Sequence, residues 1–238
     1  MTARTNALGQ PIGAPVPDWR GAAVPPRTPI PGRWCTLEPL DPARHAGDLF
    51  AAFAEDREGR NWTYLPYGPF DTKPAFERWL SQSCQGDDPL FHAVVDGADG
   101  RAAGMASHLR IAPAAGSIEV GHINLAPRLQ RTAAATEAMV LMMRRAFREL
   151  GYRRYEWKCD ALNAPSCRAA ERLGFTFEGV FRQATVVKGR NRDTAWYAVI
   201  DADWPALERA YTAWLDPANF DAAGRQRRRL SDLIGRQR

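Results

Sequence analysis

The sequence has few of the residues that bind metals or form disulfides. Its 238 residues include four cysteines and four histidines. Neither residue type shows the spacing of a metal site, so we predict no metal. The cysteines form no C-x-x-C pair, and we expect reduced thiols in a cytoplasmic protein. The cysteines are Cys35, Cys84, Cys159 and Cys167.

Long apolar runs are also absent. No window reaches the roughly 18 apolar residues that a membrane-spanning helix requires, so we predict no association with a membrane. The first residues lack the apolar run of a secretory signal peptide. Both absences favour a cytoplasmic location.

The charge balance is moderately basic. The net charge is +5 and the isoelectric point is near 9.3. The excess comes mostly from arginines that are spread along the chain rather than gathered in one run. This distribution favours a solvated basic surface over a nucleic-acid patch, and we do not expect DNA as a partner.

The chain divides into three parts. Residues 1–32 are rich in proline and have little apolar periodicity, which predicts an extended arm. Residues 33–201 contain the periodic segments of one domain, and the hydrophobic content of 45% suits a globular core. Residues 202–238 predict a terminal helix followed by a basic tail.

The order of elements predicts a mixed α/β (α+β) fold, with helices on both faces of a central sheet of about six to seven strands. Tight turns between the first strands indicate an antiparallel N-terminal part. The strand after the long helix is expected to lie parallel to the strand before it, across a right-handed crossover. The expected strands are 33–40, 90–95, 101–111, 117–125, 152–160, 175–188 and 194–201, and the expected helices are 42–54, 74–84, 133–150, 163–173 and 203–215.

The stretch from Ser117 to Leu150 organises the rest of the chain as a strand, a short loop and a helix. Apolar residues at steps of three and four predict a core-facing stripe on the helix, with Arg144, Arg145 and Arg148 on the opposite face. The first turn of the helix lacks bulky or acidic side chains. Its N–H groups therefore stay free at the positive end of the helix dipole, which favours an anion site.

Three segments together resemble the GNAT N-acetyltransferase superfamily, and its RimJ/RimL-like branch in particular. They are EVGHINLAP followed by LQRTAAATEA, then EWKCDALNAPSCRAAERLGF, then EGVFRQ followed by GRNRDTAWY. The resemblance covers roughly Arg33 to Asp201. It implies a single GNAT-type domain in which the parallel pair of strands splays apart around the cofactor, and it implies an acetyl-CoA-dependent enzyme.

The resemblance places the coenzyme pyrophosphate on the loop that follows Gln130. Ala133 stands where the family pattern has a central glycine. Alanine is tolerated there if the residue is already helical, so the amides of Arg131 to Thr136 can still hold the pyrophosphate. Arg168 and Arg172 either reach the phosphates or are solvated. The implied coenzyme contacts are Ile123, Leu125, Gln130, Arg131, Thr132, Ala133, Ala135, Thr136, Asn163 and Arg168.

The resemblance implies two catalytic residues. Glu119 matches a strand carboxylate that many members use as general base, directly or through water, although a Glu at this place can equally pair with an arginine. His122 is the competing base because its ordinary pKa suits the task better, but alternation places it on the other face unless a bulge at Gly121 intervenes. Ser166 is the expected general acid, or else it and Asn163 form a simple helix cap.

The acceptor side is predicted by analogy alone. Trp62, Tyr64 and Tyr67 in an aromatic loop, and Arg182 in the last hairpin, are expected to line it. An aromatic loop can instead simply cover a core.

Three hypotheses on function follow. The first is N-acetylation of a primary amine at a protein or peptide N-terminus, by direct attack in a ternary complex. The second keeps the chemistry but takes a small-molecule amine. The third is a non-catalytic module that binds coenzyme A or RNA. A homodimer could form by exchange of the arm and the terminal helix between subunits.

Overall fold

The computed structural model describes residues 4–235, and its centre is a mixed sheet of eight strands. In chain order the strands are β1 (Arg4–Thr5), β2 (Pro11–Ile12), β3 (Ile30–Pro31), β4 (Cys35–Pro39), β5 (Leu90–Asp96), β6 (Ala102–Ala112), β7 (Ser117–Leu125), β8 (Arg154–Asp160), β9 (Thr176–Val187) and β10 (Arg190–Ile200). The sheet order is β3-β4-β5-β6-β7-β8-β10-β9, and β1 pairs with β2 in a separate hairpin. Only β7 and β8 pair in parallel within the described sheet. The mixed α/β fold is confirmed.

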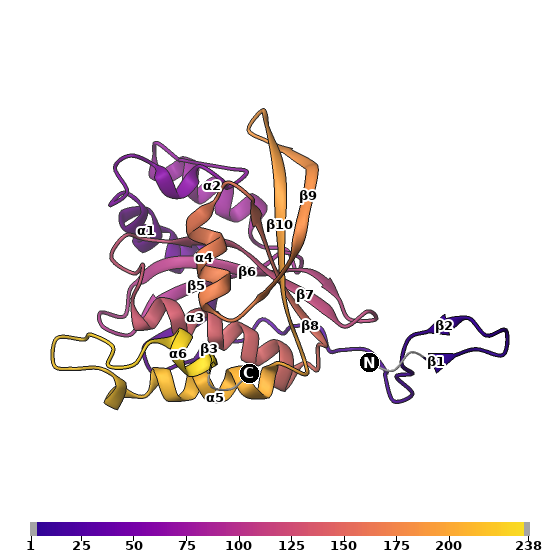
Figure 1. Ribbon diagram of the computed structural model, residues 1–238. Helices are drawn as coiled ribbons and strands as arrows, with labels where there is room; N and C mark the ends of the chain where they lie inside the picture. The colour runs from indigo at the N-terminus through magenta and orange to yellow at the C-terminus, as the bar shows by residue number, and fades with distance from the viewer. Residues whose placement is uncertain (1–3, 236–238) are drawn as a thin grey trace.

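Helices cover both faces of the sheet (Figure 1). The helices are α1 (Pro42–Phe53), η1 (Arg60–Trp62), α2 (Lys73–Ser83), α3 (Ala133–Arg144), η2 (Arg145–Glu149), α4 (Ala164–Arg172), α5 (Trp204–Leu215), η3 (Pro217–Asn219) and α6 (Leu230–Gly235). Helices α3, α5 and α6 share one hydrophobic core with the sheet, while α1 and α2 pack into a second core on the other face. None of the helices from residue 4 to residue 235 is long and apolar enough to span a membrane.

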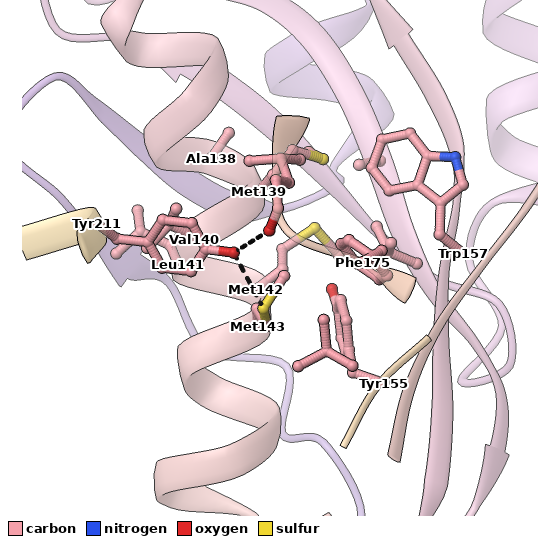
Figure 2. Close-up of a cluster of buried hydrophobic side chains, with 14 of the residues drawn as sticks. Ala138, Met139, Val140, Leu141, Met142, Met143, Tyr155, Trp157, Phe175 and Tyr211 are labelled. Carbon is pink, nitrogen blue, oxygen red and sulfur yellow. Dashed lines mark hydrogen bonds between the residues drawn. The ribbon is translucent and has the colours of Figure 1, made fainter. Parts of the chain in front are cut away.

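Helix α3 lies at the centre of the larger core. Its residues from Ala134 to Met143 are all buried, and Figure 2 shows its methionines beside Tyr155 and Phe175. The hydroxyl of Tyr211 on α5 donates to the carbonyl of Leu173 and contacts the Met143 sulfur. Because α3 is surrounded by the fold, its N-terminal end is held rigidly against the sheet.

Two sequence predictions about α3 need correction. The helix ends at Arg144 and continues as one π-helical segment, η2. Arg145 was expected on the solvent face, but it is buried. Its guanidinium donates to the carbonyls of Thr28 and Pro29, at 2.8 and 3.1 Å, and pairs with Glu149. The charge can be buried because the arm supplies its acceptors.

Part of the proline-rich arm lies against the domain. Ile30 is buried, and β3 adds the eighth strand to the seven expected from the sequence. Earlier in the arm, the Trp19 indole donates to the carbonyl of Ala114 at 2.8 Å. The hairpin of β1 and β2 projects away from the body (Figure 1). Residues 1–3 of the predicted arm and 236–238 of the predicted tail lie outside the described residues.

Candidate active site

A cleft opens where β7 and β8 separate. The two strands pair in parallel from Ser117 opposite Arg154 to Val120 opposite Trp157, and no pairing continues beyond that point in the described sheet. A cavity of about 200 Å³ lies between the separated ends. The backbone edges that face it are free to bind an extended ligand.

A bulge on β7 shapes one wall of this cleft. Its register with β6 shifts by one residue between Gly121 and Asn124, and His122 has a φ of 51°. A Cβ on Gly121 would lie 2.9 Å from a methyl carbon of Leu109, so glycine fits the close approach. The extra residue changes the alternation, and both Glu119 and His122 therefore line the cavity.

Glu119 is buried between two cations. One of its oxygens accepts from Arg110 Nη1 at 2.7 Å, and the other lies 3.0 Å from Lys158 Nζ. Burial raises the pKa of Glu119 above its ordinary value, although Lys158 and Arg110 oppose that rise. Lys158 is shared with Glu156 at 2.7 Å and lies over the ring of Trp196. Glu119 is thus a carboxylate fixed in place and able to take a proton.

His122 lies beside Glu119 but is held differently. Its Nδ1 is 3.0 Å from the hydroxyl of Tyr67, and the two rings stack. Burial, together with the charges of Arg110 and Arg192, lowers the pKa of His122 to about 4. The imidazole is therefore neutral at pH 7 and is fixed by a hydrogen bond.

The opposite wall is formed by β8 and the start of α4. The Asn163 side chain caps this helix by accepting from the Ser166 amide at 3.2 Å. The Trp157 indole donates to Ser166 Oγ at 2.9 Å. The hydroxyl oxygen thus accepts a hydrogen bond from the indole, and its own hydrogen can donate to a second partner, with the Cys159 sulfur also within its reach. Ser166 and Glu119 both line the cavity, on opposite walls.

Helix α3 begins at Ala133. Ala133 is therefore helical, which is the condition under which an alanine can stand in place of the family's glycine. Thr132 caps it: Thr132 Oγ1 accepts from the Ala135 amide at 3.1 Å, and its carbonyl accepts from the Thr136 amide. Within residues 4–235 the amides of Arg131, Thr132, Ala133 and Ala134 have no acceptor. Four amides are thus free to bind an anion instead of the six expected from the sequence, because those of Ala135 and Thr136 donate to Thr132.

The family model described as Acetyltransferase (GNAT) domain matches residues 35–176, which is more than half of the chain. The chain belongs to the GNAT acetyltransferase family. Acetyl-CoA is the acetyl donor of this family. Among curated proteins, none matches the chain.

Solved structures agree with this assignment. A GCN5-related N-acetyltransferase from Brucella melitensis is 50% identical with a TM-score of 0.90, and the match covers 92% of this chain and 99% of that one. A probable GNAT-family acetyltransferase from Chromobacterium violaceum is 43% identical with a TM-score of 0.76, over 83% and 98% of the two chains. RimL, a ribosomal alpha-N-protein acetyltransferase solved with coenzyme A, shares the fold at 22% identity and a TM-score of 0.58, over 73% and 99%.

In this GNAT acetyltransferase, the segment around η1 forms hydrogen bonds to both walls of the cleft. Asn61 Nδ2 donates to the carbonyl of Leu125 at 2.9 Å, and Gln130 Nε2 donates to the same carbonyl at 2.8 Å. The hydroxyl of Tyr64 donates to the carbonyl of Leu162 at 3.1 Å. Because the Leu125 carbonyl already accepts two hydrogen bonds, Ile123 is the better placed of the two expected backbone partners for pantetheine.

Several predicted residues do not line the cavity, among them Trp62, Arg182 and Arg168. Trp62 is only 4% exposed, and its ring packs edge-on against Phe53 and Phe70 in the second core. Its large apolar ring is stabilised by this burial. Arg182 and Arg168 are exposed and do not line the cavity.

Other predicted residues lie close to the site. Tyr67 reaches it through its hydrogen bond with His122, and Tyr64 lines it directly. Arg172 is exposed, and its guanidinium donates to Thr136 Oγ1 at 3.2 Å, near the start of α3. Its guanidinium also lies over the Trp214 ring.

Sequence reasoning missed several polar side chains that line the cavity, among them Asn61, Arg110, Lys158 and Arg192. The strand pattern offered a signal for Lys158, since a lysine inside a mostly buried strand needs a charged partner. No comparable signal marked Arg192, because the sequence placed it in a polar turn. The observed turn is shorter and lies at Lys188 and Gly189, both with positive φ, so Arg192 belongs to β10.

Among the described residues, no three or more of the His, Cys, Asp and Glu side chains gather where they could hold a metal ion. The four thiols are not bonded to one another. Cys159 and Cys167 lie in contact with their sulfurs 3.6 Å apart, beside Ser166. Cys159 also lines the cavity.

Proposed function

We propose that this acetyltransferase moves an acetyl group from acetyl-CoA to the primary amine of a protein or peptide N-terminus, by direct attack in a ternary complex. The observation that carries the proposal is that Glu119 and Ser166 face one cavity from opposite walls. A proton acceptor and a proton donor on either side of a reacting group are what acyl transfer to an amine requires.

The residues around the cleft fit acetyl-CoA. Four free amides at the start of α3 suit its pyrophosphate. The unpaired edge of β7 near Ile123 suits the amide groups of pantetheine. We place Asn163 beside the pantetheine and Arg172 near the phosphates, where its guanidinium already lies next to Thr136. The bound donor supplies an activated acetyl thioester.

We assign Glu119 as the proton acceptor for the incoming amine. Its raised pKa brings it closer to that of an ammonium group, while Arg110 and Lys158 keep its position fixed. Ser166, whose oxygen accepts a hydrogen bond from the Trp157 indole, donates its hydroxyl proton to the departing thiolate, and the proton that Glu119 took from the amine restores the hydroxyl. His122 remains neutral and helps to hold the wall through Tyr67.

The peptide acceptor rests on the likeness to RimL, whose name describes an acetyltransferase of a ribosomal protein, and on the RimJ/RimL-like motifs. The test is to give purified protein acetyl-CoA with a panel of peptides and small amines, and to follow thiol release. We expect peptides to be the better acceptors, and Glu119→Gln to lower kcat about 100-fold. A turnover confined to small amines would contradict the peptide assignment, and no turnover with any acceptor would contradict the mechanism.

A further inference from the structure

The three basic side chains that line the cavity differ in their partners. Arg110 pairs with Glu119, and Lys158 pairs with Glu119 and Glu156. Arg192 is half-buried, and within residues 4–235 it forms no ion pair, although the Asp160 carboxylate lines the same cavity, and its Nε has no hydrogen-bond acceptor. Its Nε is moreover shielded from solvent. One cation in the site is therefore left without an anion.

An unsatisfied buried donor is unfavourable. Leaving such a group without an acceptor costs about 1–3 kcal/mol, and more for a charged group. A guanidinium presents its N–H groups as a planar fork that matches a carboxylate with two parallel hydrogen bonds. The unpaired Nε and the open cavity beside it therefore suit an anion that arrives with a ligand.

The hairpin that carries Arg192 is fastened over the cleft. Lys188 Nζ donates to the carbonyl of Trp62, and Arg190 donates to the carbonyl of Thr63, each at 2.8 Å. These bonds hold the tip of β9 and β10 against the η1 segment. They fix Arg192 at the cavity, while Arg182 on the neighbouring strand stays outside it.

Arg192 lies near both walls but away from the expected pyrophosphate site. Its charge adds to the burial that lowers the pKa of His122 on β7, and it also influences Cys159 on β8. None of the residues at the start of α3 lines this cavity. An anion bound by Arg192 would therefore be separate from the pyrophosphate. It would lie in the cavity where the amine is expected to react.

We propose that Arg192 binds a carboxylate of the acceptor, so that the preferred acceptors are amines that carry a nearby carboxylate. The inference rests on the proposed acetyl transfer and narrows its substrate class. The carboxylate can come from an acidic side chain in the first residues of a peptide or from the α-carboxylate of a free amino acid. Both sources present the same fork-shaped acceptor to the guanidinium.

The test measures binding as well as turnover, so that a failure of catalysis does not hide the result. Acceptors are offered as isosteric pairs in the presence of coenzyme A: peptides with Asp or Asn at the second position, and amino acids as acids or amides. Calorimetry gives the Kd of each, and thiol release gives kcat and KM. We expect the wild-type protein to favour the acid over the amide at least tenfold in one of the two series, which also identifies the source.

Arg192→Gln should bring that ratio to about one by raising the Kd and KM of the acid, with the acetyl-CoA Kd changed less than twofold. Arg182→Gln is the matched control, because it removes the same charge from the same hairpin outside the cavity, and it should retain the full preference. Equal binding of acids and amides by the wild-type protein would overturn the proposal. So would an Arg192→Gln variant that loses acetyl-CoA affinity instead. Turnover without a preference for acids would contradict only the role of Arg192. Acid-selective binding without turnover would contradict only the proposed acetyl transfer.

Discussion

Two helices begin at the edges of the same cleft, and their first turns differ in what they leave free. At the start of α3, four successive amides have no acceptor in the described structure. At the start of α4, every amide is used: that of Ala164 donates to Leu162, Pro165 has none, and those of Ser166 and Cys167 donate to Asn163. The first turn of α3 can thus bind a ligand through backbone N–H groups, whereas the first turn of α4 can bind one only through its side chains.

This difference suggests a division of labour. Free amides at a helix start bind an anion through backbone and dipole, and their contribution should appear in coenzyme affinity. A fully satisfied helix start holds its side chains still, and Ser166 should matter for turnover. The same secondary structure therefore serves binding in one place and chemistry in the other.

The largest effect is expected from an aspartate at the first position of α3. Ala133→Asp places a carboxylate among the free amides of α3. A carboxylate and a phosphate about 4 Å apart repel each other by roughly 4 kcal/mol at an effective dielectric constant of about 20, or about 1000-fold in affinity. We expect calorimetry with acetyl-CoA to show that loss. The helix itself should be stabilised by about 0.3–1 kcal/mol, because the new charge suits its dipole.

Ala164→Asp is the control, because Ala164 is exposed at the corresponding position of α4. It should change the acetyl-CoA Kd less than threefold. If both variants lose affinity equally, the two helix starts do not differ as described.

The second effect concerns the side chain on α4. Ser166→Ala should lower kcat about 100-fold, which is at the lower end for a general acid, while the acetyl-CoA Kd stays within threefold. Steady-state kinetics and calorimetry on the same preparation measure both. A variant with weakened coenzyme binding and normal kcat would place Ser166 among the binding groups instead.

The third effect is on the pH dependence. Like Ser166, Glu119 is expected to act in turnover rather than in coenzyme binding. Burial raises the pKa of Glu119 above its ordinary value. A protonated carboxyl cannot accept a proton, so kcat should fall about tenfold per pH unit as the pH drops below that raised pKa. Glu119→Gln should remove this acid limb. A wild-type limb that persists unchanged in the variant would assign the base elsewhere, with His122 as the next candidate.

The smallest effect is expected from the cap of α3. Thr132→Ala removes the acceptor of the Ala135 amide and should lower the free energy of unfolding by about 1 kcal/mol. Thr132→Ser keeps the hydroxyl and should recover most of it. Urea denaturation measures both variants. A Thr132→Ala protein as stable as the wild type would show that core packing alone fixes the helix start.

Much of this contrast could be predicted from the sequence. The alanine run after Thr132 predicts a helix start without side-chain obstruction, and Asn163 three residues before Ser166 predicts a capped one. Both helices begin where the pattern indicates. Local capping chemistry decides these positions, so local sequence is sufficient.

Long-range contacts decided what could not be predicted. Arg145 fits a solvent face by periodicity, yet it is buried because carbonyls of the arm, more than 100 residues away, accept its N–H groups. The aromatic loop does not reveal which rings enter the core, and Trp62 does so. Arg192 was assigned to a turn, since the positive φ of Lys188 was not evident from its residue type.

The central claim is that the free amides of α3 hold the pyrophosphate, and one comparison tests it most directly. Calorimetry measures the Kd of acetyl-CoA and of S-acetylpantetheine, which lacks the pyrophosphate, for the wild-type protein and for Ala133→Asp. We predict that the variant binds acetyl-CoA as weakly as the wild-type protein binds S-acetylpantetheine, and that its affinity for S-acetylpantetheine is unchanged. An Ala133→Asp protein that weakens both ligands equally, or neither, would contradict the claim.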